Sequence, residues 1–208
     1  MSAQILGLFP VPFMRVERLL GAGLIGALLE RVESETLATN ARSTNLSHSR
    51  IMRPDTDALY AQIAALVMPR IVQFGATLFG ETLEWTVKEM WLNVLERGGC
   101  QSLHAHANSF ISGVLYLTPV DPSAHTVFHR AMGTAEFVFS NNNQRARIGP
   151  YNGTKWIVPK VLPGDLALWP SYLLHEVPAN MGERRVSIAF NAIPSRLDSW
   201  GYAISFDA

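Results

Sequence analysis

Residues 98–117 read G-G-C-Q-S-L-H-A-H-A-N-S-F-I-S-G-V-L-Y-L and place His104 and His106 two positions apart. Because side chains alternate faces along an extended strand, both imidazoles point to the same side, where they can reach one metal ion. The flanking residues 88–95 and 110–117 are compatible with β-strands, which would fix the positions of the ligands. This pattern predicts two ligands of a metal site on a sheet.

A third ligand must come from another part of the chain. The remaining histidines are His48, His125, His129 and His175. Only His175 follows both a Pro-Gly-Asp turn, residues 163–165, and an apolar strand-like run. An H-x-H pair is also common on solvated strand faces, so the prediction depends on this second histidine segment. We expect His104, His106 and His175 to bind one divalent metal ion.

An R-x-S motif follows the distal histidine. Arg185 lies ten residues after His175, and Ser187 shares its face of the predicted strand. A guanidinium fork together with a hydroxyl donor can bind a carboxylate. Arg184 should point to the opposite face, where Glu183 is its expected weak partner.

In combination, these motifs resemble the Fe(II)/2-oxoglutarate-dependent oxygenases of the double-stranded β-helix fold. Four segments look like the bacterial and phage group named putative 2OG-Fe(II) oxygenases. They are W-L-N-V-L-E-R-G-G, H-A-H-A-N-S-F-I-S-G-V-L-Y-L, L-P-G-D-L-A-L-W-P-S-Y-L-L-H-E-V-P-A-N and R-V-S-I-A-F-N. The resemblance covers residues 91–191, about half of the chain. One position departs from the superfamily, because most members have Asp or Glu where this chain has His106.

The resemblance implies a chemistry and a role for each motif residue. Fe(II) would be bound by His104, His106 and His175, and 2-oxoglutarate would be the cosubstrate, with its C5 carboxylate on Arg185 and Ser187. The family reaction decarboxylates 2-oxoglutarate to succinate and carbon dioxide and removes hydrogen from a nearby substrate carbon. Three neutral ligands would leave Fe(II) with its full charge. We expect Asn93 and Tyr116 to face the same cavity, although Tyr116 could equally be an ordinary strand aromatic.

Two other classes of protein fit part of the pattern. Gly98, His104 and His106 match the G-x5-H-x-H motif of cupin-like metalloenzymes that do not use 2-oxoglutarate, but the usual Glu is missing and Arg185 has no role there. The second class is a non-catalytic jelly-roll binding protein with structural histidines. Metal analysis separates this binding protein from the enzymes, and 2-oxoglutarate turnover separates the two enzymes.

Composition narrows the remaining classes. The 208 residues carry 17 basic and 17 acidic side chains, so no strong field attracts nucleic acid or an anionic membrane. The single cysteine, Cys100, excludes an internal disulfide and fits a reducing compartment, so we expect a cytoplasmic protein. The length and even composition predict a single domain over residues 1–208. The sequence does not name the substrate, which we expect to be a small molecule or a peptide.

The first 80 residues are expected to support the sheet. Residues 4–13 should form an extended lead-in at a sheet edge, and residues 16–33 a core-packing helix rather than an export signal. Residues 36–53 look like a long polar loop. Residues 55–78 should form an amphipathic helix that begins at Asp55 or Thr56 and is kinked or split at Pro69.

From Leu83 onward the chain has the composition of short strands separated by turns. The strands are expected at residues 83–95, 109–117, 126–130, 135–140, 155–161, 166–170, 174–178 and 184–193. The predicted fold is mainly β with N-terminal helices, a double-stranded β-helix (jelly roll) over about residues 83–195. The polar segment 141–147 could be a lid or a solvated loop.

Overall fold

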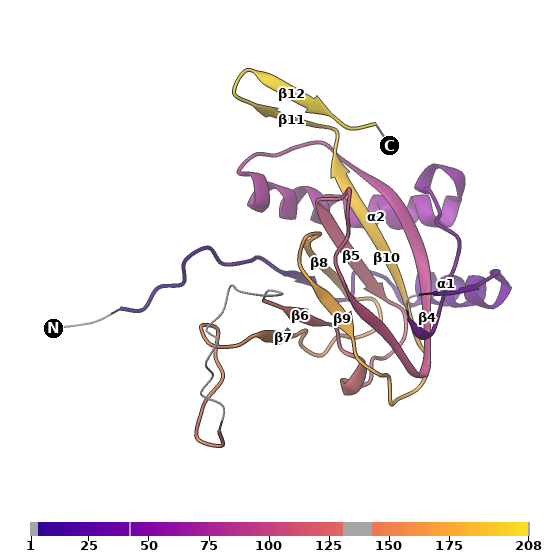
Figure 1. Ribbon diagram of the computed structural model, residues 1–208. Helices are drawn as coiled ribbons and strands as arrows, with labels where there is room; N and C mark the ends of the chain where they lie inside the picture. The colour runs from indigo at the N-terminus through magenta and orange to yellow at the C-terminus, as the bar shows by residue number, and fades with distance from the viewer. Residues whose placement is uncertain (1–3, 42, 131–142, 208) are drawn as a thin grey trace.

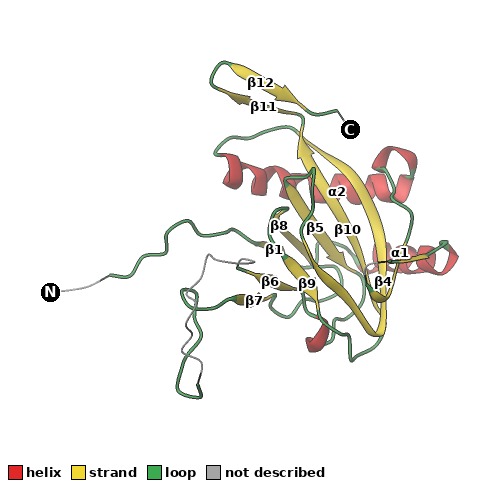
Figure 2. Cartoon of the chain, in the orientation of Figure 1, coloured by secondary structure: helices red, strands yellow, loops and turns green. Residues whose placement is uncertain are grey.

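A computed structural model of the chain describes residues 4–41, 43–130 and 143–207, and Figure 1 shows a curved sheet with helices on its outer side. The helices and strands are β1 Met14–Val16, α1 Ala22–Ser34, β2 Ala38–Thr39, β3 Thr44–His48, η1 Pro54–Thr56, α2 Ala58–Phe79, β4 Trp85–His104, β5 Ile111–Tyr116, η2 Pro122–Ala124, β6 Val127–His129, β7 Lys155–Ile157, β8 Leu166–Pro170, β9 His175–Val177, β10 Arg185–Pro194, β11 Arg196–Ser199 and β12 Tyr202–Ser205. The predicted β-rich jelly roll with N-terminal helices is confirmed (Figure 2). The predicted strand at residues 135–140 lies outside the described residues.

All the strand pairs of the main sheet are antiparallel. The strand order is β1-β8-β5-β10-β4-β9-β6-β7, with β3 on β4 and β2 on β3. Strand β4 is twenty residues long: its first part pairs with β10, and its end, at Gln101 and His104, pairs with β9. Because β4 takes part in both halves, the sheet curls around an inner space that is lined from both sides.

The two faces of β10 have different partners. Val186, Ile188 and Phe190 belong to the large core that also contains Leu28 of α1 and Ile63 of α2. Arg185, Ser187 and Ala189, at the alternate positions, face the inner space of the curled sheet. The two-residue period of a strand therefore separates a hydrophobic core on the helical side from a lined cavity on the other.

The N-cap of helix α2 lies just beyond the predicted Asp55 or Thr56. The N-cap is Asp57, whose carboxylate accepts hydrogen bonds from the backbone N–H groups of Leu59 and Tyr60 at 2.9 and 3.3 Å. The helix is continuous through Pro69, so the predicted split is wrong. By length and composition α2 could cross a membrane, but its buried residues pack in the core of the sheet, as expected for a core helix.

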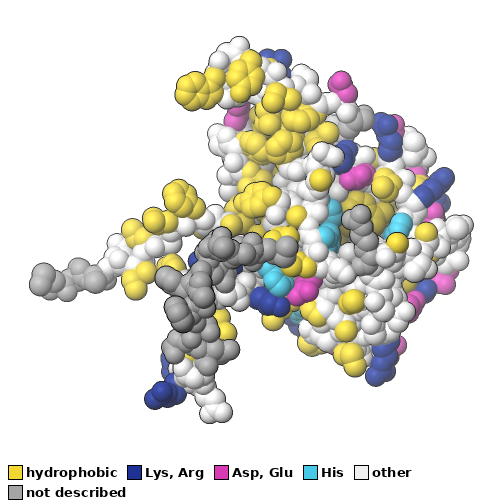
Figure 3. Space-filling model, viewed as in Figure 1, with side chains coloured by type: hydrophobic (Ala, Val, Ile, Leu, Met, Phe, Trp, Pro, Cys, Tyr) yellow, Lys and Arg dark blue, Asp and Glu magenta, His cyan; other side chains and the backbone are white. Residues whose placement is uncertain are grey.

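The N-terminal part of the chain reaches the sheet edge later than predicted, at β1. The predicted lead-in at residues 4–13 forms no strand and extends away from the sheet with exposed hydrophobic side chains (Figure 1 and Figure 3). Strand β1 pairs with β8, and the buried carboxylate of Asp165 accepts bonds from Arg15 Nη2 at 2.7 Å and from the backbone N–H groups of Arg18 and Leu162 at 3.0 Å. Burial alone would raise the pKa of Asp165, but these donors outweigh it and hold the pKa below its usual value. The Pro-Gly-Asp turn therefore fastens β1 to the start of β8.

Three local features of the structure differ from the predictions. The segment 36–53 is not all loop, because β2 and β3 lie within it and satisfy their backbone by pairing onto β4. The strand predicted at residues 83–95 was too short: β4 runs on through Gly98, at φ +78°, where the pairing with β3 shifts register. The hairpin formed by β11 and β12 was also not expected, and Figure 1 shows it projecting beyond β10.

Replacing glycine with alanine should have opposite effects on stability at Gly75 of α2, which packs on β4, and at Gly26 of α1. A Cβ at Gly75 would lie 2.5 Å from Trp85 Cζ2, whereas a Cβ at Gly26 in α1 would meet nothing within 4 Å. Gly75→Ala should lower the free energy of unfolding by about 1 to 3 kcal/mol through overpacking. Gly26→Ala should raise it by roughly 0.5 to 1 kcal/mol through helix propensity. Denaturant unfolding checks both, and a stable Gly75→Ala protein would contradict the close approach.

Candidate metal and cosubstrate site

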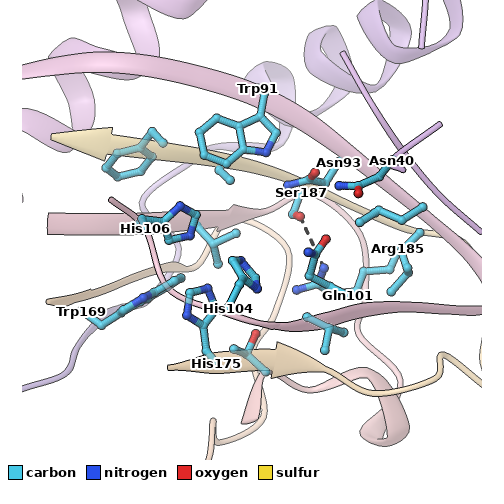
Figure 4. Close-up of a pocket in the computed structure, with 18 residues that line it drawn as sticks. Asn40, Trp91, Asn93, Gln101, His104, His106, Trp169, His175, Arg185 and Ser187 are labelled. Atoms are coloured by element: carbon cyan, nitrogen blue, oxygen red, sulfur yellow. Dashed lines mark hydrogen bonds between the residues drawn. The ribbon is translucent and has the colours of Figure 1, made fainter. Parts of the chain in front are cut away.

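The three predicted histidines converge on one point at the mouth of the curled sheet (Figure 4). His104 ends β4 and His175 begins β9, and the two are cross-strand partners. Their ring centroids are 4.3 Å apart, and that of His106 lies 5.1 and 5.2 Å from them. One ligand nitrogen from each residue lies within 4.8 Å of the other two. The donor set therefore fits a divalent metal that prefers imidazole.

His106 reaches the other two histidines by a different route from the predicted one. Strand β4 ends at His104, so His106 does not share a strand face with it. It lies in the following loop, where its backbone N–H donates to the carbonyl of Ser171 at 3.0 Å. This bond to the end of β8, rather than strand alternation, brings His106 to the other two histidines.

Two of the three imidazoles are held in the tautomer that a metal needs. His104 Nδ1 lies 2.7 Å from the Ser102 carbonyl and His175 Nδ1 lies 2.9 Å from the Leu173 carbonyl. A carbonyl only accepts, so each Nδ1 carries the proton and each Nε2 keeps its lone pair for a metal. His106 Nδ1 has a different neighbour, the side-chain amide Nδ2 of Asn191 at 3.5 Å.

Burial keeps these histidines neutral. It lowers the pKa of His175 to about 3 and that of His106 to about 4, and the proximity of His104 lowers both further. Burial likewise lowers the pKa of His104. A metal ion binds the neutral imidazole, so at neutral pH no proton has to be lost from a charged histidine before a metal binds.

Arg185 is a buried cation on the wall of the same cavity. Its Nη1 donates to Ser187 Oγ at 3.5 Å, its guanidinium lies 5.4 Å from the centre of the Tyr116 ring, and its Nε is buried without a hydrogen-bond partner. Burial lowers the pKa of Arg185, but a guanidinium stays charged. Within the described part of the chain no carboxylate forms an ion pair with it, and a buried charge needs a partner. A carboxylate ligand would supply that partner.

Arg184 points to the outside, as expected from strand alternation. Its guanidinium contacts Glu33 at 2.7 Å and Glu96 at 2.9 Å, so the expected partner, Glu183, was wrong. The two neighbouring arginines therefore differ in kind: one is paired at the surface, and the other is buried beside the cavity.

The cavity between the halves of the sheet joins the histidines to Arg185. Its lining residues are Asn40, Leu46, Trp91, Asn93, Leu95, Gln101, His104, His106, Gly113, Val114, Thr126, Trp169, His175, Val177, Arg185, Ser187, Ala189 and Phe190. Asn93 lies opposite Ser187 across the β4–β10 pair and lines the cavity as expected. Tyr116, on the other side of Ser187, does not line it: this ring is fully buried against the Arg185 guanidinium.

The other histidines lie away from this cavity. His48 ends β3 with Nδ1 2.8 Å from the Ser49 carbonyl, and His125 Nδ1 lies 2.9 Å from the Val158 carbonyl. His129 Nε2 lies 2.8 Å from Glu176 Oε1 at the surface of β6 and β9. Cys100 is partly buried and is not a neighbour of the cavity.

Sequence reasoning missed several lining residues, although strand parity could have found some of them. Trp91 lies two residues before Asn93 and Ala189 two residues after Ser187, so each shares a face with a predicted site residue. Trp169 lies in a run that is buried throughout, and its sequence has no alternation to mark a face. Asn40 follows β2 and donates its backbone N–H to Leu46, and Gln101 pairs with Val177 of β9, so both positions depend on contacts that no local sequence pattern marks.

Comparison with known proteins places this geometry in a family. The model of the family described as "Putative 2OG-Fe(II) oxygenase" matches residues 89–191, about half of the chain. This match spans β4 to β10 and includes all three histidines, Arg185 and Ser187. The chain belongs to this oxygenase family. A search of curated proteins found no match.

Several solved structures have the same fold. HygX from Streptomyces hygroscopicus, with nickel and 2-oxoglutarate bound, matches at a TM-score of 0.65 and 15% identity, covering 89% of this chain and 84% of its own. A Pseudomonas putida prolyl-4-hydroxylase matches at 0.58 and 18%, covering 87% and 92%. The epimerase SnoN from nogalamycin biosynthesis matches at 0.61 and 12%, covering 89% and 79%.

The family assigns the enzyme class and its cofactors. The chain is a 2-oxoglutarate-dependent oxygenase, an oxidoreductase with Fe(II) as its metal and 2-oxoglutarate as cosubstrate. The cupin-like alternative and the non-catalytic binding protein are therefore set aside.

The lowered histidine pKa values predict how stability depends on pH. Unfolded histidine titrates near 6.5, whereas folded His106 and His175 titrate at about 4 and about 3. The unfolded chain therefore binds more protons in this interval, and the free energy of unfolding falls as the pH decreases through it. The metal-free protein should melt at a lower temperature near pH 5 than near pH 7.5. His175→Gln should weaken this dependence, and equal melting temperatures in the parent protein would contradict buried neutral histidines.

Proposed function

We propose that the oxygenase hydroxylates a C–H bond of a substrate in this cavity, with Fe(II) on His104, His106 and His175 and the C5 carboxylate of 2-oxoglutarate on Arg185. The observation that carries the proposal is the buried Arg185 guanidinium, which faces the same cavity as the histidines and has no carboxylate partner in the described chain. The prolyl-4-hydroxylase match supports hydroxylation as the outcome.

The protein's own side chains would bind and orient the cosubstrate. Arg185 would form a charge-assisted pair with the distal carboxylate, and Ser187, already 3.5 Å from Arg185 Nη1, would add a hydroxyl donor. The Tyr116 ring packs under the guanidinium and restricts its position. Once bound, Fe(II) and 2-oxoglutarate would supply the oxidation: dioxygen would be consumed, with one oxygen atom going into succinate as carbon dioxide is released and the other into the hydroxylated substrate carbon.

The rest of the cavity favours an uncharged substrate group. Apart from Arg185 and the histidines, every described lining residue is neutral. Trp91 lies beside His106 with ring centroids 6.0 Å apart, and Trp169 beside His175 at 5.0 Å. The two indoles would flank a flat or apolar group near the metal, and Trp169 Nε1, buried without a partner, could donate to an oxygen of that group.

Partners and compartment are also proposals. We infer a small-molecule or peptide substrate, because the balanced charge of the chain does not favour nucleic acid or an anionic membrane as a partner. The single cysteine supports a cytoplasmic location.

The metal assignment predicts the loss of iron from three single variants. Replacing His104, His106 or His175 with Ala removes one ligand, so each purified protein should lose stoichiometric Fe(II) under anaerobic reconstitution. His129→Ala is the matched control, because that histidine pairs with Glu176 outside the cavity. Full iron occupancy in His106→Ala would remove His106 from the ligand set.

The carboxylate assignment predicts a difference between two adjacent arginines. Arg185→Ala removes a charge-assisted pair worth about 1.5 to 3 kcal/mol and should weaken 2-oxoglutarate binding roughly ten- to a hundredfold while sparing iron. Arg184→Ala should change neither, because it loses only surface pairs with Glu33 and Glu96. Anaerobic titration of the Fe(II) protein, followed by its metal-to-ligand charge-transfer band, measures both. Equal effects of the two substitutions would overturn the assignment.

A further inference from the structure

A line of polar side chains crosses the sheet behind His106. Asn191 of β10 lies opposite Glu89 of β4 on one side and opposite Ser112 of β5 on the other. Its Nδ2 donates to Glu89 Oε1 at 2.7 Å, and its Oδ1 accepts from Ser112 Oγ at 2.8 Å. Ser112 Oγ continues the line to Ser171 Oγ at 2.9 Å. Asn191, Ser112 and Ser171 are buried, so this line is fixed by packing as well as by hydrogen bonds.

This line determines which way the Asn191 amide points. An ionised carboxylate only accepts hydrogen bonds, so the Glu89 side of the amide must be its NH2 group. The same NH2 group lies 3.5 Å from His106 Nδ1. An NH2 group only donates, so it favours the His106 tautomer that has its lone pair on Nδ1 and its proton on Nε2.

We propose that Asn191, oriented by Glu89 and Ser112, is a positioning residue that holds His106 in the tautomer opposite to that of His104 and His175. The carbonyls of Ser102 and Leu173 leave Nε2 of those two histidines free for a metal. His106 must either move its proton from Nε2 to Nδ1 or bind through Nδ1, and both changes break its contact with Asn191. His106 is then the ligand that rearranges when the metal enters.

The inference rests on the proposed metal site, but its first test needs no metal. The full-length, metal-free protein with 15N-labelled histidine is measured by long-range 1H–15N correlation at neutral pH, with His106→Gln assigning the signals of His106. We expect a proton on Nδ1 of His104 and His175 and on Nε2 of His106. A His106 proton on Nδ1 would overturn the proposal, whether or not the protein binds metal.

The second test exchanges the amide and the carboxylate between the paired strands. In the double variant Glu89→Gln with Asn191→Asp, the net charge and an amide–carboxylate bond are kept, but the carboxylate lies beside His106. It would accept the Nδ1 proton and leave Nε2 for the metal. A carboxylate partner of this kind is worth about 10- to 100-fold in metal affinity, so Co²⁺ should bind tighter by that factor.

Two further variants serve as controls for the double variant. Glu89→Gln alone removes the negative charge beside Asn191 Nδ2 and Lys88 Nζ, 3.3 Å away, without placing a carboxylate at His106, and should not reproduce the gain. Asn191→Ala removes the donor, and His106 should then show a larger share of the Nδ1 proton even if the double variant does not fold. Unchanged Co²⁺ affinity in a folded double variant, or an unchanged His106 tautomer in Asn191→Ala, would overturn the role of Asn191. Failure of the parent protein to bind Co²⁺ would instead count against the metal site.

Discussion

The antiparallel pairing of β10 with β4 on one side and β5 on the other is the constraint on which the rest of the structure depends. Residues 187–192 of β10 each have a fixed neighbour on both strands: Ser187 lies between Asn93 and Tyr116, and Asn191 between Glu89 and Ser112. The same register sends Val186, Ile188 and Phe190 into the helical core. A shift of one residue would exchange the two faces, moving Arg184 toward the cavity and Arg185 into contact with the helical side.

The cavity contains two kinds of polar group, the imidazoles and the guanidinium, and one ligand could pair with both. Three buried imidazoles lie close to one another, and a buried guanidinium has an Nε without a partner. A divalent cation would use the lone pairs of the first group, and a carboxylate would compensate the charge of the second. A chelating keto acid that reaches from the metal to Arg185 satisfies both demands with one molecule, which agrees with the absence of any other charged side chain among the described lining residues.

The sequence allowed the fold class and the main site residues to be predicted because both depend on short-range patterns. Strand alternation separated Arg185 from Arg184, and the turn at residues 163–165 marked the second histidine segment. The errors come from contacts distant in sequence. Strand β4 continues through Gly98 because β3 and the loop at Asn180 pair with it there, and His106 depends on a bond to Ser171. The polar line from Glu89 through Asn191 to Ser112 joins three strands, so no local pattern reveals it.

The position of β10 in the chain also has a consequence for how the protein reaches its native state. Helix α2 is complete at Phe79, but the strand at the centre of the sheet that it covers begins only at Arg185. During synthesis, the apolar face of α2 must therefore remain exposed, or be covered by transient partners, while about a hundred further residues are made. Pairing of such distant segments carries a high contact order, which slows folding and prolongs the interval in which unpaired strand edges can associate with other chains.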